Sequence, residues 1–438
     1  MTGQPGMAAR ADLGGPVRLT AGWQAGRPAS LREHLERYGA LPEAGRQALA
    51  AEVAAAGLTG RGGAGFPTGT KMRAVAAGRG PAVVVANGAE SEPVSEKDQA
   101  LLARAPHLVL DGIAAAAEAV GATEAHLCLS RTRGWLTGTV LAALGERQQA
   151  GLDRVPLSVQ EIPHGYTSSE ESSLVHWLNG GEAKPTTTPP RPFERGVGRR
   201  PTLVSNVETF ANIALIARYG AAWYRSAGLA GAAGTMLTTV TGAVTQPGVF
   251  EVPAGTTVGQ IMAMAGVAAD VQALLIGGYF GTWHDMAEVA RLPFTDEGLG
   301  PVGGSPGAGV LVALPAEECG LAEAARILRF LASQSAQQCG PCMFGLPAIA
   351  EDLTQLAGRR PESDPLERMQ RRFGQISGRG ACRHPDGAVR MAASALRAFA
   401  ADAHAHQRRR SCLADRRRPQ QLTSAQSVTR PGTEGGWQ

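Results

Sequence analysis

The stretch that decides the fold is Gly57–Lys71, which reads GLTGRGGAGFPTGTK. Its segment Gly60–Gly65 fits G-x-G-x-x-G, the pattern of a dinucleotide-binding turn. Such a turn follows a β-strand, whereas residues 48–56 are Ala-rich and helical in pattern. A Walker loop fails too, because Lys71 lacks the required Gly before it and Ser or Thr after it. The stretch therefore predicts either a simple turn or an anion-binding nest, in which free backbone N–H groups and the charges of Arg61 and Lys71 meet a phosphate.

Strand and helix patterns alternate around this loop. The strand patterns are short apolar runs, and the helix patterns place apolar residues three and four apart. We predict strands over 83–85, 125–129 and 155–162, and helices over 31–38, 42–56, 101–120, 134–149 and 207–219. This alternation is typical of an α/β layer with parallel strands, here a Rossmann-like domain.

The pattern of predicted strands and helices changes after about residue 235. Runs at 237–244 and 249–252 flank a Pro-Gly turn and predict a β-hairpin. With a helix over 258–265 and a strand over 273–276, this part is a β-grasp-like module. The rest is helical in pattern, over 322–332, 345–356, 366–373 and 389–404. We expect five parts: an N-terminal segment (1–45), the α/β domain (46–228), the β-grasp module (235–312), a helical bundle (320–406) and a basic, disordered tail (407–438).

Composition excludes several classes of protein. The chain has 42 Lys and Arg against 38 Asp and Glu, a net charge of +4, and two of its arginine triplets lie in the tail. No basic stripe suggests a nucleic-acid partner. No apolar run reaches the roughly 18 residues of a membrane span, and the first residues lack a signal pattern. We expect a cytoplasmic protein without direct membrane insertion, at most peripheral to a membrane complex.

The six cysteines point to metal or redox chemistry. They are too sparse for a disulfide scaffold, and four of them fall in the last hundred residues. Cys339 and Cys342 form a C-x-x-C motif, and Cys382 follows in the same helical part. Zinc is a rival to iron–sulfur chemistry for a C-x-x-C motif alone. Two others, Cys128 and Cys319, are expected to be ordinary thiols.

The Gly57–Lys71 stretch closely resembles the flavin loop of the NADH-binding, FMN-carrying subunit of respiratory complex I and of its soluble hydrogenase and formate dehydrogenase relatives. Three more blocks follow in the family's order, over 87–93 (NGAESEP), 165–172 (GYTSSEES) and 201–209 (PTLVSNVET). The resemblance covers about 48–405, in which the β-grasp module is similar to the family's SLBB domain and the bundle to its iron–sulfur domain.

The resemblance implies roles for individual residues. The glycine loop and Lys71 would cradle the FMN phosphate and ring edge, and Asn87 and Glu90 would bond the flavin. Glu92 and Glu171 would bracket the nicotinamide of NADH. The full cofactor-binding set is Gly60, Arg61, Gly62, Gly63, Gly65, Phe66, Lys71, Asn87, Glu90, Glu92, Glu170, Glu171, Asn206 and Thr209. No catalytic acid or base is required, because the cofactor carries the chemistry.

The chain departs from the family within this pocket. Two aromatic positions that normally hold the adenine are Ala74 and Arg191, which leaves Phe66 as the surviving ring. Arg191 suits a phosphate instead, including a 2′-phosphate. Four further positions replace an expected Asp, Gly, Gly and Asn: Ala89, Ser91, Ser169 and Ser205. FMN binding is therefore better supported than NADH binding.

In the family, three close cysteines and one distant cysteine hold a [4Fe–4S] cluster. Cys339, Cys342 and Cys382 match three of these positions, but the first falls at Ala336, which has no ligand atom. The fourth ligand would come from Cys412, our first candidate, or from His384. Alternatively the site holds a labile or three-iron cluster, or has lost its cluster and keeps free thiols.

The resemblance implies an oxidoreductase that passes electrons from NADH through FMN to a [4Fe–4S] cluster, and on to a ferredoxin-like partner subunit or a quinone-linked chain. One alternative is a ferredoxin-linked flavoprotein that no longer binds NADH. The other is a non-catalytic scaffold that has lost both cofactors.

Overall fold

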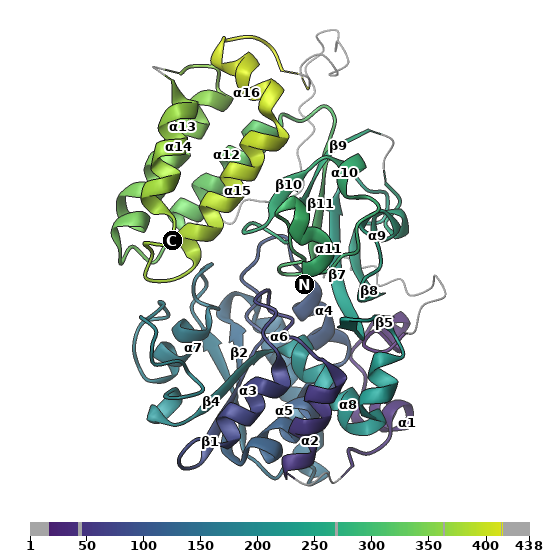
Figure 1. The fold of residues 1–438 in the computed structure, drawn as a ribbon. Helices are drawn as coiled ribbons and strands as arrows, with labels where there is room; N and C mark the ends of the chain where they lie inside the picture. Colours follow the sequence, from purple (N-terminus) through teal and green to yellow (C-terminus); the bar gives the residue numbers. More distant parts are fainter. Residues whose placement is uncertain (1–16, 43–45, 268–269, 362–363, 413, 415–438) are drawn as a thin grey trace.

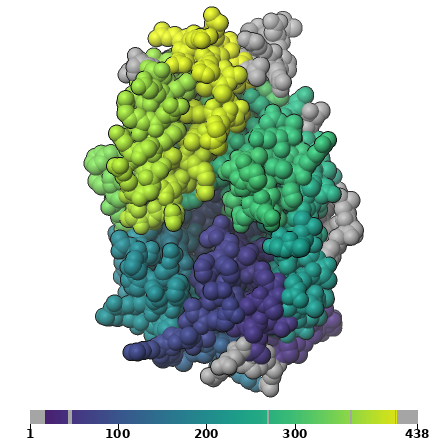
Figure 2. Space-filling model, in the orientation of Figure 1, coloured from purple at the N-terminus to yellow at the C-terminus, as the bar shows by residue number. Residues whose placement is uncertain are grey.

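The computed structural model describes residues 17–42, 46–267, 270–361, 364–412 and 414 of the chain. It has three parts, an α/β part below, a β-grasp module above it and a helical bundle beside that module (Figure 1). The surface view shows the bundle and the module resting together on the α/β part (Figure 2). The predicted order of architectures along the chain is confirmed.

The α/β part is built on a four-stranded parallel sheet in the order β3-β2-β1-β4. Three of its strands were predicted, and the short strand β4 was missed because it follows directly on an irregular Pro- and Arg-rich loop. The strands are β1 (Ala82–Asn87), β2 (Ala122–Ser130), β3 (Leu157–Ile162) and β4 (Thr202–Asn206).

Both faces of this sheet are buried, because side chains alternate along each strand. In β1, Val84 and Ala86 join the large core formed with the helices α5 (Pro106–Val120) and α8 (Val207–Arg225). Val83 and Val85 face the other way and pack with residues of α7 (Glu171–Leu178). The remaining helices of this part are α1 (Leu31–Tyr38), α2 (Arg46–Ala56), α3 (Thr68–Ala76), α4 (Lys97–Arg104) and α6 (Gly134–Gln149).

The helix predicted over 101–120 is two helices, α4 and α5. Pro106 disfavours helical backbone at Ala105, whose φ of −132° breaks the helix, and the proline then starts α5. Among the described residues no single helix is long and apolar enough to cross a membrane; α4 and α5 together would qualify by length and composition alone, but they meet at 97°.

The β-grasp module has a mixed five-stranded sheet in the order β10-β9-β11-β7-β8. The predicted hairpin is β7 (Thr235–Gly242) with β8 (Gly248–Pro253), and α9 (Val258–Met264) packs on one face. In β9, Leu274 and Ile276 face α9, whereas Ala273 and Leu275 join the core of the helical bundle. The other elements are β5 (Gly228–Leu229), β6 (Ala232–Ala233), β9 (Val271–Ile276), β10 (Thr282–His284), α10 (Met286–Val289), α11 (Asp296–Leu299) and β11 (Val310–Pro315).

The bundle runs up and down along α12 (Gly320–Ser333), α13 (Leu346–Ala357), α14 (Pro365–Ile376), α15 (His384–Ala398) and α16 (Ala400–Gln407) (Figure 1). A turn of π-helix, Pro341–Gly345, opens α13. The helix predicted over 389–404 begins earlier, where Pro385 occupies the first turn, and it divides at Phe399.

The structure describes part of each predicted end segment. Of the N-terminal segment, residues 1–16 lie outside the described part, but Arg18, Leu19 and Thr20 all donate backbone N–H groups to the carboxylate of Glu251 in β8. Of the predicted disordered tail, residues 408–412 are described and Cys412 is buried, so disorder does not begin at 407; residues 413 and 415–438 lie outside the described part.

Candidate functional site

The predicted site residues gather at the carboxyl edge of the parallel sheet. Asn87 ends β1 and Asn206 ends β4, while Glu170 and Glu171 begin α7, the helix that follows β3. The strand order makes the crevice between β1 and β4 the point where the winding of the sheet reverses. In open α/β sheets, ligands bind in this crevice.

The glycine loop closes over this edge from outside the sheet. It lies between α2 and α3, as its sequence context predicted, and is pinched shut by the N–H of Gly60, which donates to the carbonyl of Phe66 at 2.9 Å. The N–H of Arg61 donates to Thr209 Oγ1 at 2.9 Å. A Cβ on Gly62 would lie 3.4 Å from the Cβ of Asn206, so the loop rests directly on the start of α8.

The tip of the loop offers a row of unused donors. The N–H groups of residues 62–65 make no hydrogen bond of normal geometry within the described part of the chain. Gly63 and Gly65 have φ of +99° and +61°, conformations that L side chains rarely adopt. Successive free N–H groups in such a turn form a concave anion site, so the nest interpretation is favoured over the simple turn.

Lys71 brings a positive charge to the same edge. Its Nζ donates to the carbonyl of Val204 in β4 at 2.8 Å and lies 2.7 Å from Glu171 Oε1. Lys71 and Glu171 were predicted from blocks a hundred residues apart, and the structure joins them.

Arg61 has a different role from the one predicted. Its guanidinium lies within 4.0 Å of Glu208 and donates to the hydroxyl of Tyr224 at 3.0 Å and to the carbonyl of Thr235 at 3.2 Å. Its charge therefore ties the loop to α8 and to the start of β7. The guanidinium is thus committed to holding the loop in place, which does not support the expectation that this side chain meets a phosphate.

Three more predicted side chains support the loops of the site. Glu90 accepts N–H groups from Asp98 and Gln99 at the start of α4 and pairs with Arg133 at 3.1 Å. Glu170 caps α7 by accepting two of its first N–H groups, and Asn206 caps α8 by accepting the N–H of Glu208. Their polar atoms are thus partly or wholly committed to holding the carboxyl edge in shape.

Glu92 lies where the three parts of the molecule meet. Its Oε2 accepts the hydroxyl of Tyr166 at 2.8 Å and the N–H of Tyr279, from the β-grasp module, at 2.9 Å. Burial raises the pKa of Glu92 to about 7. The structure places Glu92 with these tyrosines and Glu171 with Lys71, and the two do not share a hydrogen-bond partner among the described residues.

Two of the positions that we expect to depart from the family contact each other. The hydroxyls of Ser91 and Ser169 are hydrogen-bonded, and Ser91 also donates to the carbonyl of Tyr166 at 2.9 Å. Asn87 donates to the carbonyl of Ser169 at 2.8 Å. These serines therefore bridge the loops that follow β1 and β3. Phe66, the surviving ring, is 49% exposed.

A buried charged group supports the site and was missing from the predicted set. Lys97 Nζ lies 2.7 Å from Asp98 and 2.9 Å from Glu208, and all three side chains are buried. Burial raises the pKa of Asp98 to about 6, against the opposing effect of Lys97. Lys97, Asp98 and Glu208 lie within or just after the sequence blocks quoted above, but their burial could not be read from the sequence.

A cavity of about 580 Å³ adjoins the glycine loop. Gly60, Arg61, Gly63 and Gly65 line one side of it, and the β-grasp module, including residues 293–298, lines the other. The module therefore closes the space beside the loop, whereas Lys71 and Glu171 meet at the carboxyl edge. The glycine backbone, free N–H groups and lysine together fit a phosphate-bearing cofactor such as FMN.

The bundle brings three of the predicted cysteines together. Burial raises the pKa of Cys342 to about 12, with Cys339 and Cys382 near enough to add to the effect. A single ion such as zinc would need all three sulfurs within about 4.8 Å of one another. Among the described residues, these three sulfurs do not meet that condition. Three cysteines at this wider spacing fit a multi-iron cluster, and Ala336 is buried, 8% exposed, where the fourth cysteine would stand.

The first candidate for the fourth ligand is wrong. Cys412 lies beside Cys319, at the start of α12, whereas Cys339 follows the end of that helix. The 14 residues of α12 span about 20 Å, so Cys412 is at the opposite end of the bundle. The second candidate, His384, is buried at the start of α15, and its Nε2 is 2.7 Å from the carbonyl oxygen of Leu331.

Comparison with known proteins identifies the family. The Nuo51 FMN-binding domain matches residues 53–215, the SLBB domain 237–273, and the NADH-ubiquinone oxidoreductase-F iron-sulfur binding region 322–406. The NADH-quinone oxidoreductase-F protein of Streptomyces coelicolor is 30% identical over 84% of this chain and 84% of its own length. The chain belongs to the NADH-quinone oxidoreductase-F family.

Other proteins similar to this chain agree with the assignment. The NADH-quinone oxidoreductase-F protein of Escherichia coli is 31% identical over 80% of this chain and 82% of its own. A solved structure of an NAD⁺-reducing [NiFe]-hydrogenase in the air-oxidized state superposes with a TM-score of 0.81 at 30% identity, and covers 90% of this chain and 67% of that one. The family matches together take in the glycine loop, the three further predicted blocks and the three clustered cysteines.

Proposed function

We propose that this protein is an NADH-oxidising flavoprotein that transfers electrons from NADH through FMN to an iron–sulfur cluster and on to a partner electron-transfer protein. The observation that carries the proposal is the row of unbonded N–H groups at residues 62–65, set beside Lys71 at the switch point of a parallel sheet. The family to which the chain belongs supports the identity of the cofactors.

The residues of the chain would hold the FMN phosphate by backbone donors and one cation. The nest of residues 62–65 supplies directed N–H groups, and Lys71 supplies a charge that the carbonyl of Val204 keeps in place. Without the cofactor, the carboxylate of Glu171 neutralises the charge of Lys71. Thr209 and Asn206 act as positioning residues, because they fix the loop against α8.

A bound FMN supplies the ability to accept a hydride's two electrons and to release them one at a time. The protein contributes position, charge and exclusion of water. The β-grasp module closes one side of the glycine loop, and Tyr166, Tyr279 and Glu92 join the module to the loops after β1 and β3.

The iron–sulfur cluster would be held by Cys339, Cys342 and Cys382. This cysteine group adjoins the carboxyl edge of the sheet, because the ring of Tyr166, in the loop after β3, lies 5.8 Å from the ring of His384, two residues after Cys382. Flavin and cluster would therefore lie side by side, as single-electron transfer between them requires. We further propose that the acceptor is a ferredoxin-like partner that docks near the cluster, by analogy with the assemblies in which relatives occur.

The test is anaerobic purification followed by flavin and iron quantitation and an assay of NADH oxidation with an artificial electron acceptor. We expect bound FMN, iron and NADH turnover. Loaded protein without turnover would refute NADH oxidation and favour the ferredoxin-linked alternative. Protein with neither flavin nor iron after reconstitution would refute the whole proposal and favour a scaffold.

Lys71→Met tests the cofactor site directly. Removing a charge-assisted hydrogen bond costs about 1.5–3 kcal/mol, so the FMN dissociation constant should rise about 10- to 150-fold. The matched control is Lys184→Met, which removes an equal charge from a partly exposed lysine paired only with Glu182 among described residues. Equal FMN affinity in both variants would remove Lys71 from the site.

A further inference from the structure

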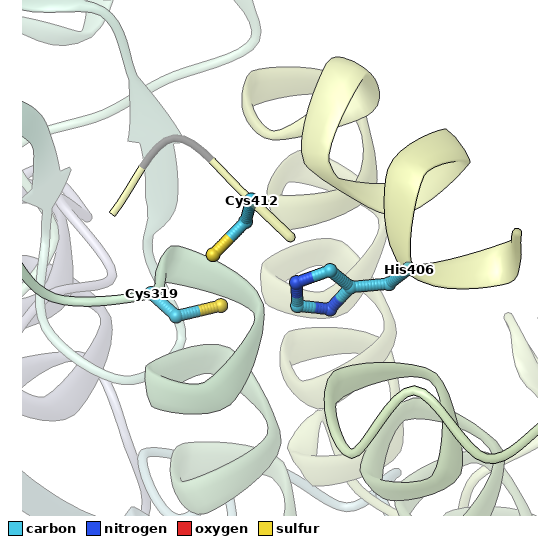
Figure 3. A group of neighbouring side chains, drawn as sticks. All are labelled: Cys319, His406 and Cys412. Carbon is cyan, nitrogen blue, oxygen red and sulfur yellow. The ribbon is translucent and has the colours of Figure 1, made fainter. Parts of the chain in front are cut away.

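A second group of metal-binding side chains lies at the other end of the bundle. Cys319 immediately precedes α12, His406 is in the last turn of α16, and Cys412 follows α16, and their side chains point toward one another (Figure 3). One ligand atom of each lies within 4.8 Å of the other two. His406 and Cys412 are 0% and 1% exposed, so the group is nearly closed to solvent.

The donor types and charges suit one soft divalent cation. Two thiolates and one neutral imidazole are ligands that zinc takes with a fourth position left to water. Two thiolate charges would neutralise the ion, which allows it to be buried. This set of three donors fits zinc better than it fits an iron–sulfur cluster or a hard cation.

Hydrogen-bond donors lie beside both sulfurs of the group. The N–H groups of Leu321 and Ala322, at the start of α12, donate to the sulfur of Cys319. Arg359 Nη2 lies 3.7 Å from Cys412 Sγ. Helix N–H groups and a guanidinium both stabilise a sulfur anion.

This group is separate from the iron–sulfur cysteines. The length of α12, about 20 Å, lies between Cys319 and the turn that carries Cys339. Both of its thiols also fall outside residues 322–406, the extent of the iron–sulfur region shared with the family. His406, the third member of the group, is the last residue of that region.

We propose that Cys319, His406 and Cys412 bind one zinc ion, with water as the fourth ligand. The ion would fasten the chain that follows α16 to the junction between β11 and α12. The ion would take no part in electron transfer, because the group is buried and lies at the opposite end of the bundle from the iron–sulfur cysteines. The proposal does not depend on the redox function.

The first test measures zinc and iron in the full chain, purified anaerobically, in wild type and in the variants Cys412→Ala and His406→Gln. We expect about one zinc per chain in wild type, loss of zinc in both variants, and unchanged iron and flavin. Cys128→Ala is the matched control, since it removes a buried cysteine in β2 and should keep the zinc. Wild type without zinc, a Cys319–Cys412 disulfide in its place, or loss of iron rather than zinc would overturn the proposal.

The second test needs no variant and so does not depend on how the variants fold. Zinc-edge X-ray absorption of the wild-type holoprotein should show two sulfurs at about 2.3 Å and nitrogen or oxygen ligands at about 2.0–2.1 Å. A shell of four sulfurs, or one of nitrogen and oxygen only, would refute the assignment.

Discussion

Replacing Glu92 with glutamine should make the protein more stable above neutral pH. The carboxyl group of Glu92 joins Tyr166 to the N–H of Tyr279 across three parts of the molecule, and burial raises its pKa from 4.5 to about 7. A raised pKa means that the folded protein prefers the protonated acid. Its contribution to the free energy of unfolding is therefore full below pH 4.5 and is lost as pH rises toward 7.

The magnitude follows from that difference in pKa. At about 1.4 kcal/mol per pH unit, the interval from 4.5 to about 7 corresponds to about 3 kcal/mol. Glutamine keeps a side-chain oxygen that can accept both hydrogen bonds, but it carries no charge at any pH. Glu92→Gln should thus match wild type near pH 4.5 and exceed it by up to about 3 kcal/mol above pH 7.

The assay is urea unfolding of the intact chain between about pH 5 and pH 8, followed by tryptophan fluorescence, with the first transition compared between proteins. Other titrating groups, including Asp98, act in both proteins and cancel in the difference. Glu36→Gln is the control, because Glu36 is exposed and only weakly paired with Arg32 at 3.7 Å, so its profile should follow wild type. Parallel profiles for wild type and Glu92→Gln would refute the argument from burial.

Two further predictions concern the cluster and the core. Ala336→Cys should supply the missing thiolate, so the iron content after reconstitution should rise toward four per chain. The cluster should also survive longer in air than the wild-type cluster. Iron content and the visible spectrum are the measurements, and unchanged iron would mean that residue 336 does not face the cluster. Gly112→Ala should destabilise the α/β part by at least about 1–3 kcal/mol, measured by thermal unfolding. The new Cβ would lie 1.8 Å from the carbonyl oxygen of Phe210, where α5 crosses α8. Gly138→Ala, in the open on α6, should instead be neutral or gain about 1 kcal/mol, and similar losses at both glycines would contradict this packing.

Local patterns in the sequence determined most of the secondary structure. The helices over Leu31–Tyr38 and Gly134–Gln149 were predicted at their observed bounds, because apolar spacing and end signals are properties of neighbouring residues. The glycine loop was also recognisable, since glycines at positive φ have few substitutes. Errors in the helices arose at Pro106 and Phe399, where a break divides an otherwise continuous apolar pattern.

Only the tertiary structure decided which side chains meet. The sequence placed Arg61 at the phosphate, but packing of α8 against β7 draws its guanidinium away to Tyr224. It also assigned Cys412 to the iron–sulfur site, but the up-and-down course of the bundle carries Cys412 back to Cys319. Helix and strand patterns repeat over a few residues and can be read along the chain. Contacts between residues a hundred positions apart depend on the direction and packing of every element between them, and no local pattern records these.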